Sequence, residues 1–179
     1  MSYRELKSYQ QATTIYDFTV KFCDRYIDRK SRTVDQMVQA ARSGKQNIVE
    51  GASEKTSKQG ALKLTGVARA SFQELLEDYE DFLRQRELRL WDGQSAEAQA
   101  VRALVYETSP SYKTYMSYID NPEVAANAMI CLINQTDFLL DRQIKFMEKD
   151  FAETGGYMEN LKRKRENAKK EILFKRFIE

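Results

Sequence analysis

Histidine is absent from the sequence, and its two cysteines, Cys23 and Cys131, lie far apart in the chain. Histidine is the most common general base and metal ligand in proteins, so its absence disfavours the usual catalytic and metal centres. No Cys-x-x-Cys spacing, P-loop or dinucleotide fingerprint occurs either. We therefore expect a non-catalytic protein without cofactor, metal or catalytic residues. An enzyme would need a pocket of perturbed carboxylates, which a sequence does not reveal.

Glycine and proline are scarce, with only 7 and 2 residues in a chain of 179. This scarcity excludes loop-rich and β-sandwich proteins, whereas the abundant Ala, Glu, Lys, Leu, Arg and Gln lose little side-chain freedom in a helix. No apolar run approaches the roughly 20 residues that span a bilayer. The polar start MSYRELKSYQQ lacks the apolar segment of a secretory signal. We expect an all-α, cytoplasmic protein with no membrane partner.

Apolar residues recur at helical spacing in several long segments. The first helix is predicted over residues 3–28, with a heptad seam and a second apolar line beside it. The seam consists of Leu6, Tyr9, Thr13, Tyr16, Val20, Cys23 and Ile27, and the second line consists of Ile15, Phe18, Phe22 and Tyr26. The second helix is predicted to open at a capping box of Thr33 and Gln36 and to stop at Gly51. The third is predicted over residues 57–88.

Asn121-Pro122-Glu123 predicts the start of a fourth long helix, which should reach about Phe151. The insert before it, at about 91–120, holds a predicted helix over 96–106 and a Tyr-rich stretch over 112–119 that fits a short helix or a loop. Gly155-Gly156 separates one last helix. The predicted fold is an antiparallel up-down four-helix bundle over residues 1–154, followed by an extra C-terminal basic helix over 155–179.

Charge is unevenly distributed, although the net charge is only +2. Residues 157–179 hold eight Lys or Arg and four Glu, so a basic tail follows a mildly acidic body. Phosphate binding requires such charge, because the release of condensed counterions drives association. A solvated helix face is the alternative. No base-reading motif predicts sequence-specific recognition. The candidate nucleic-acid-binding residues are Arg25, Arg29, Lys30, Arg32, Lys55, Lys58, Lys162, Arg163, Lys164, Arg165, Lys169 and Lys170.

Carboxylates cluster in the third predicted helix. A di-metal bundle would require Glu-x-x-His pairs, and the chain has none. We therefore interpret this cluster as a solvated acidic face. Its members are Glu74, Glu77, Asp78, Glu80 and Asp81.

Two blocks of sequence resemble one known family. Ser43 followed by Asn47-Ile48-Val49-Glu50-Gly51, and then Ala68-Arg69-Ala70-Ser71-Phe72-Gln73-Glu74-Leu75, are similar in order and spacing to the signature of proteins encoded in intervening sequences of bacterial 23S ribosomal RNA genes. Gln39, Gly44 and Ala70 depart from the family pattern. Gly44 lies mid-helix, where glycine costs about 1 kcal/mol relative to alanine unless a neighbouring helix needs the space.

The resemblance extends to the C-terminal third of the chain, at residues 123–135 and 151–157, where it is similar to a family variant with a suffix domain. It implies an up-down bundle that forms a homopentamer. Related accessory proteins of diversity-generating retroelements are basic pentamers that bind nucleic acid and a reverse transcriptase. No catalytic residues come with the family. We expect a mainly structural role for the signature residues Ser43, Asn47, Glu50, Gly51, Ser71 and Glu74.

Two functional hypotheses follow. The first is a homo-oligomeric, pentameric scaffold that binds RNA or DNA through its basic surfaces and accompanies an RNA- or reverse-transcriptase-containing complex. The second is a protein-interaction scaffold without nucleic acid, in which the last helix lays its apolar side on a partner or a neighbouring subunit. That apolar side consists of Tyr157, Leu161 and Ile172.

Overall fold

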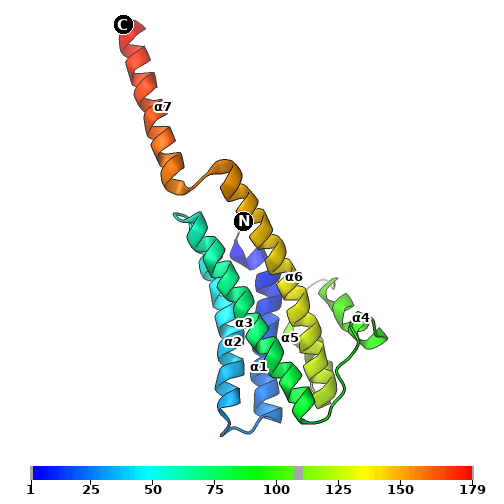
Figure 1. Cartoon of the computed structure of the whole chain (residues 1–179). Coiled ribbons are helices and arrows are strands. Elements are labelled where there is room, and N and C mark those ends of the chain that lie inside the picture. The colour runs from blue at the N-terminus through cyan, green and yellow to red at the C-terminus, as the bar shows by residue number, and fades with distance from the viewer. Residues whose placement is uncertain (1, 107–110, 179) are drawn as a thin grey trace.

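The computed structural model describes residues 2–106 and 111–178, with side chains up to Phe174. Within these ranges every regular element is a helix and no strand occurs, so the all-α prediction is confirmed. The long helices of the body are α1 (Lys7–Tyr26), α2 (Arg32–Ser53), α3 (Lys58–Gln85) and α6 (Pro122–Thr154). They lie side by side in Figure 1, where α1 packs on α2 and α6, and α3 packs on the same two helices.

Shorter elements complete the body. They are the 3-10 helices η1 (Tyr3–Glu5), η2 (Leu104–Tyr106) and η3 (Met116–Tyr118), and the helices α4 (Ala96–Ala103) and α5 (Tyr112–Tyr115). Helix α4 packs on α6, and α5 packs on α1. Helix α7 (Tyr157–Ile178) projects from the end of α6, away from the body (Figure 1). Three short parts of the predicted elements lie outside the described residues: residue 1 of the bundle, residues 107–110 of the insert and residue 179 of the last helix.

Two predicted details of α2 are wrong. Ser31, rather than Thr33, caps its start, because the Ser31 hydroxyl accepts a hydrogen bond from the backbone N–H of Thr33 at 3.2 Å. Gly51 does not end the helix, which continues to Ser53. Gly51 is instead a buried point of close approach to α3, since a Cβ there would lie 3.2 Å from the carbonyl oxygen of Ala61.

The second predicted apolar line is the most deeply buried part of α1, and the heptad seam lies at the edge of this face. Ile15, Phe18 and Phe22 are fully buried, whereas Val20 of the seam is 37% exposed and most of its other members are half-buried. The aromatic residues decide this orientation, because they bury the largest apolar area. The ring of Phe22 contacts Tyr79 and Phe82 of α3 with centroid distances of 4.9 and 4.8 Å.

Helices α2 and α3 approach closely at Gly44. A Cβ on Gly44 would lie only 2.6 Å from Cζ of Phe72, whose side chain is fully buried. The neighbouring helix therefore needs this space, which accounts for a glycine in the middle of a helix. The close approach fixes how the two helices align and brings the polar signature residues of both into contact.

Candidate functional site

The signature residues Ser43, Asn47 and Ser71 form a directed chain of hydrogen bonds between α2 and α3. The Asn47 amide donates to the Ser43 carbonyl and hydroxyl at 2.9 and 3.2 Å. The Ser43 and Ser71 hydroxyl oxygens are 2.9 Å apart, and Ser71 donates to the carbonyl of Val67 at 3.0 Å. Because a hydroxyl has one proton, Ser43 is the donor to Ser71. These contacts support a packing role for the three side chains.

The other signature residues lie apart from this chain. Glu50 on α2 and Glu74 on α3 are exposed, and Gly51 is buried against α3. The structure thus divides the signature into an interhelical polar contact, a glycine at a close approach and two surface carboxylates. The two surface carboxylates are the most exposed side chains of the signature.

The candidate basic residues near the end of α1 differ in how they are engaged. Arg25 forms a salt bridge with Asp120 at 2.9 Å, and Arg29 forms one with Asp24 at 2.7 Å. Both guanidinium groups are thus already beside a carboxylate. Of the four candidate residues at this end of the body, Lys30 and Arg32 are exposed and have no carboxylate beside them among the described residues.

Lys55 and Lys58 lie at the opposite end of the body, where α3 begins. The Lys58 ammonium contacts Asp150 of α6 at 2.5 Å and also donates to the hydroxyl of Thr154. Lys58 therefore ties α3 to the last turns of α6, and Lys55 is exposed. The two ends are separated by the length of α1, whose 20 residues span about 30 Å. On a single chain these residues do not form one basic patch.

The densest basic group lies on α7. Every side chain described from Leu161 to Phe174 is exposed, including those of all the candidate residues of this helix. Arg163 donates to the Asn160 side chain at 2.6 Å, within the first turns. No folded layer covers these charges in the part of α7 whose side chains are described. This helix is the most accessible cationic element of the chain.

The joint between α6 and α7 has a defined geometry. Gly155 has a φ of +72°, in the region that favours glycine, and its N–H donates to the carbonyl of Phe151 at 2.9 Å. Glu159 accepts from the N–H of Gly156 at 2.8 Å. The Asn160 amide donates to the carbonyls of Gly156 and Gly155 and to that of Thr154. The first turn of α7 therefore sets the direction in which the helix leaves the body.

One carboxyl group inside the body has a perturbed pKa. Asp137 on α6 is 6% exposed and accepts a hydrogen bond from Gln73 of α3. Burial raises the pKa of Asp137 from 3.8 to about 6, against the opposing effects of Gln73 and the Arg69 guanidinium. Asp141, paired with Arg69 at 2.6 Å, adds to the rise. This carboxyl lies between α3 and α6.

The cysteine thiols also have raised pKa values. Burial is the main cause in both, and it raises the pKa of Cys23 to about 12. A thiol with such a pKa is a poor nucleophile at neutral pH. Within residues 2–106 and 111–178, no group of three or more His, Cys, Asp or Glu side chains is placed to hold a metal ion.

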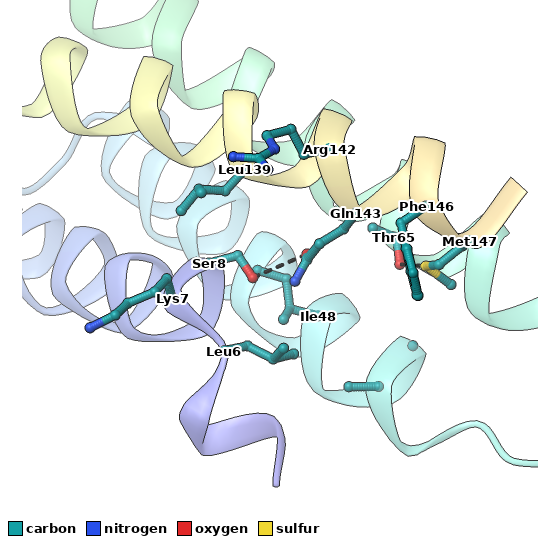
Figure 2. Close-up of a pocket in the computed structure, with 12 residues that line it drawn as sticks. Leu6, Lys7, Ser8, Ile48, Thr65, Leu139, Arg142, Gln143, Phe146 and Met147 are labelled. Atoms are coloured by element: carbon teal, nitrogen blue, oxygen red, sulfur yellow. Dashed lines mark hydrogen bonds between the residues drawn. The ribbon is translucent and has the colours of Figure 1, made fainter. Parts of the chain in front are cut away.

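An apolar groove that sequence reasoning missed lies where α1 begins (Figure 2). Leu6 and Ser8 approach it from the start of α1, and Leu139, Phe146 and Met147 from α6; its volume is about 540 Å³. The Ser8 hydroxyl donates to the Gln143 side-chain oxygen at 3.1 Å across it.

The groove exists because α1 starts at Lys7 while α2 and α6 continue past it. Phe146 and Phe138 are 72% and 62% exposed on α6. The sequence contains a signal for this exposure. At helical spacing, both phenylalanines lie on a different side of α6 from its buried residues Ile133, Thr136 and Leu140. Beyond Arg142 the groove meets a second one of about 780 Å³, which α4 and α6 line in part.

In the described part of the chain, no helix combines the length and apolar character needed to cross a lipid bilayer. Comparisons of the chain with known protein families, with curated proteins and with solved structures found no match. The resemblance to the intervening-sequence family stays a prediction that rests on the two signature blocks.

Proposed function

We propose that this protein is a non-catalytic, homo-oligomeric scaffold that binds the phosphates of RNA or DNA through α7. The four long helices serve in this proposal as an antiparallel up-down bundle that assembles into a pentamer, the state that the family resemblance implies. Lys30 and Arg32 at the far end of the body supply a second, weaker contact. An RNA- or reverse-transcriptase-containing complex is the proposed setting, and the cytoplasm the proposed compartment.

The observation that carries the proposal is the exposure of α7 together with its charge. A helix of 22 residues that leaves the body with its described side chains open to solvent gains little from packing in its own chain. The cations from Lys162 to Lys170, whose side chains the structure describes, are free of the carboxylate partners that occupy Arg25, Arg29 and Lys58. Cations displayed in this way release counterions from a polyanion without reading its bases.

The direct test is fluorescence anisotropy with labelled single-stranded and duplex RNA and DNA over a range of salt concentrations. Wild-type protein should bind more weakly as salt rises. The variant K162A/R163A/K164A/R165A should reduce the slope of log affinity against log salt by about 3, because four phosphate contacts are lost. Light scattering on the same samples gives the oligomeric state.

A matched control removes four exposed lysines from the body, as K21A/K63A/K113A/K145A. It changes the net charge equally and should leave most of the binding. Two results would overturn the assignment of α7 as the phosphate-binding element. One is a wild-type affinity that does not change with salt concentration, and the other is an equal loss of affinity in the two variants.

A protein-interaction scaffold without nucleic acid is the second candidate, and the groove of Figure 2 favours it. Phe146 is exposed in this groove of about 540 Å³, and Phe138 is exposed in the neighbouring one; such apolar surface is typical of a face that binds protein. Under this proposal, Phe146→Ser should abolish partner capture, and no salt-dependent binding of nucleic acid should be measurable. Salt-dependent binding by wild type would count against it.

A further inference from the structure

Helix α7 carries a stripe that contains no acidic residue. At about 100° per residue, five positions fall within roughly 40° of a single line along the helix. The stripe is apolar at its two ends and basic in its middle, and the three glutamates between Tyr157 and Phe174 lie elsewhere on the helix. We call it the α7 stripe, and it consists of Met158, Lys162, Arg165, Lys169 and Ile172.

A groove of complementary character runs between α2 and α3 on the body. Its volume is about 630 Å³, and it continues into a hollow of about 340 Å³ that shares Gln36 and Asp78 with it and ends at Ile27 and Phe82. We call the two together the acidic groove. The first part is lined by Gln36, Gln39, Ala40 and Ser43 of α2 and by Glu74, Glu77 and Asp78 of α3.

The three carboxylates of the first part, Glu74, Glu77 and Asp78, form no salt bridge among the described residues, whereas the hollow is lined by Asp28 and Asp81 and also by the cation Arg86. In the part of the chain that the structure describes, Asp81 is the one α3 carboxylate with a salt bridge, to Arg84 at 2.6 Å. Burial and the neighbouring charges of Asp81 and Glu74 raise the pKa of Asp78. The groove thus concentrates negative charge that a cationic partner would stabilise.

We propose that the α7 stripe of one copy docks in the acidic groove of a second copy. The basic middle of the stripe then faces Glu74, Glu77 and Asp78, and its apolar ends cover the apolar parts of the groove floor. The stripe is long enough to cover the groove, since it spans about 21 Å, about one helical turn more than the roughly 16 Å of α3 from Glu74 to Gln85. Charge complementarity of this kind sets register and steers association.

The same contact does not form within one chain. Lys58 contacts Asp150 and Thr154, so α7 begins level with the start of α3. If α7 folded back along α3, its basic middle would lie about 14 Å from the joint, whereas Asp78 lies about 30 Å along α3 from Lys58. The chain also turns α7 away from the body (Figure 1).

Pairing of two α7 helices would not provide the basic stripe with opposite charge either. It would bring Lys162, Arg165 and Lys169 of one copy against the same cations of another, and like charges in an interface are destabilising. Among the described residues, the acidic groove offers the opposite charge. The inference rests on the self-association in the proposed function. It leaves Arg163, Lys164 and Lys170, which lie on the other side of α7 from the stripe, open to phosphate.

The test uses two full-length charge-reversal variants and the mass of each by sedimentation at low salt. One is E74K/E77K in the groove, and the other is K162E/R165E in the stripe; all four side chains are exposed, so folding is preserved and can be checked by circular dichroism. Each variant alone should have its dissociation constant for self-association raised at least about tenfold. An equimolar mixture of the two should associate again, because each stripe then meets a groove of opposite charge.

The outcomes separate this inference from the proposed function. If wild type is associated and each reversal variant sediments with the same mass as wild type, the α7 docking is overturned and the oligomeric scaffold is kept. Recovery in the combined quadruple variant, without recovery in the mixture, would place the contact within one chain and also overturn it. The control E50K/E148K, with the same charge change at exposed sites outside the groove, should keep wild-type association.

Discussion

The ring of Phe72 occupies the space in which a side chain on Gly44 would begin. A Cβ at this position would lie 2.6 Å from Cζ and 2.7 Å from Cε2 of the ring. The ring is held on several sides by the core, so it has no room to withdraw. Glycine is thus a steric requirement of the contact between α2 and α3.

Gly44→Ala should lower the free energy of unfolding by about 1–3 kcal/mol, because overpacking forces shifts in a dense core. Chemical denaturation monitored by circular dichroism measures this change. The control is Gly66→Ala on α3, where nothing lies within 4 Å of the added Cβ. That substitution should stabilise the protein by about 0.5–1 kcal/mol through helix propensity. A Gly44→Ala variant as stable as wild type would contradict the steric account.

The raised pKa of Asp137 makes stability depend on pH. Because its folded pKa of about 6 lies above its ordinary value of 3.8, the protonated carboxyl stabilises the fold below pH 3.8. That contribution is lost as pH rises through about 6. Asp137→Asn removes the charge and keeps an oxygen that accepts from Gln73. At pH 7 it should raise the free energy of unfolding by about 2 kcal/mol.

The stabilisation by Asp137→Asn should disappear below about pH 4, where the wild-type carboxyl is protonated in both states. Urea denaturation at pH 4, 5.5 and 7 gives the comparison. Glu148→Gln serves as a control, because this carboxylate is exposed on the same helix. A benefit from Asp137→Asn that is equal at all three values would refute the assigned pKa.

Gly155→Ala should loosen the joint between α6 and α7. At a φ of +72° an alanine is strained by about 1–3 kcal/mol, and its Cβ would lie 2.5 Å from Oε2 of Glu159. Hydrogen exchange at the amides of Gly156 and Asn160 should therefore accelerate. Gly156→Ala is the matched control, since its Cβ would be 3.5 Å from the Phe151 ring. Equal exchange in both variants would show that the joint is not fixed by Gly155.

The basic residues beside the loop between α1 and α2 should contribute unequally to nucleic-acid binding. K30A/R32A removes two exposed cations without carboxylate partners, and should lower the salt slope by about 1–2. R25A/R29A removes two cations that are already paired with Asp120 and Asp24, and should have a smaller effect. Anisotropy titrations of the two variants test the difference. The reverse order would show that nucleic acid displaces the carboxylates.

Helical periodicity predicted the long helices to within a few residues at most ends, because α1, α3 and α6 carry their apolar residues on regular lines. It did not predict which apolar line of α1 is the most deeply buried. Both lines fit a helix, and the choice depends on the Phe22 contacts with Tyr79 and Phe82, which lie far away in sequence. The same limit applies to Gly51, where a local stop signal competes with the close approach of Ala61.

The sequence predicted which residues carry the positive charge of the candidate site. It did not predict which of them are already paired with a carboxylate. Sequence clusters identified the candidate cations of α7 from Lys162 to Lys170, which are exposed. They could not reveal that Lys58 is bound to Asp150, because that partner arrives from another helix. They also did not reveal the groove near Phe146, which results from the different lengths of neighbouring helices. Relative helix length is a property of the assembled body and has no local signal.

The separation of α7 from the body has a consequence for how this protein can evolve. Substitutions at exposed positions from Leu161 to Phe174 change no contact of the core. The partner that α7 binds can therefore change without a loss of folding. Substitutions at Gly44 or Phe72 have no such freedom. Relatives of this chain should therefore diverge most in their last helix, and lineages with different partners should be distinguishable by α7 alone.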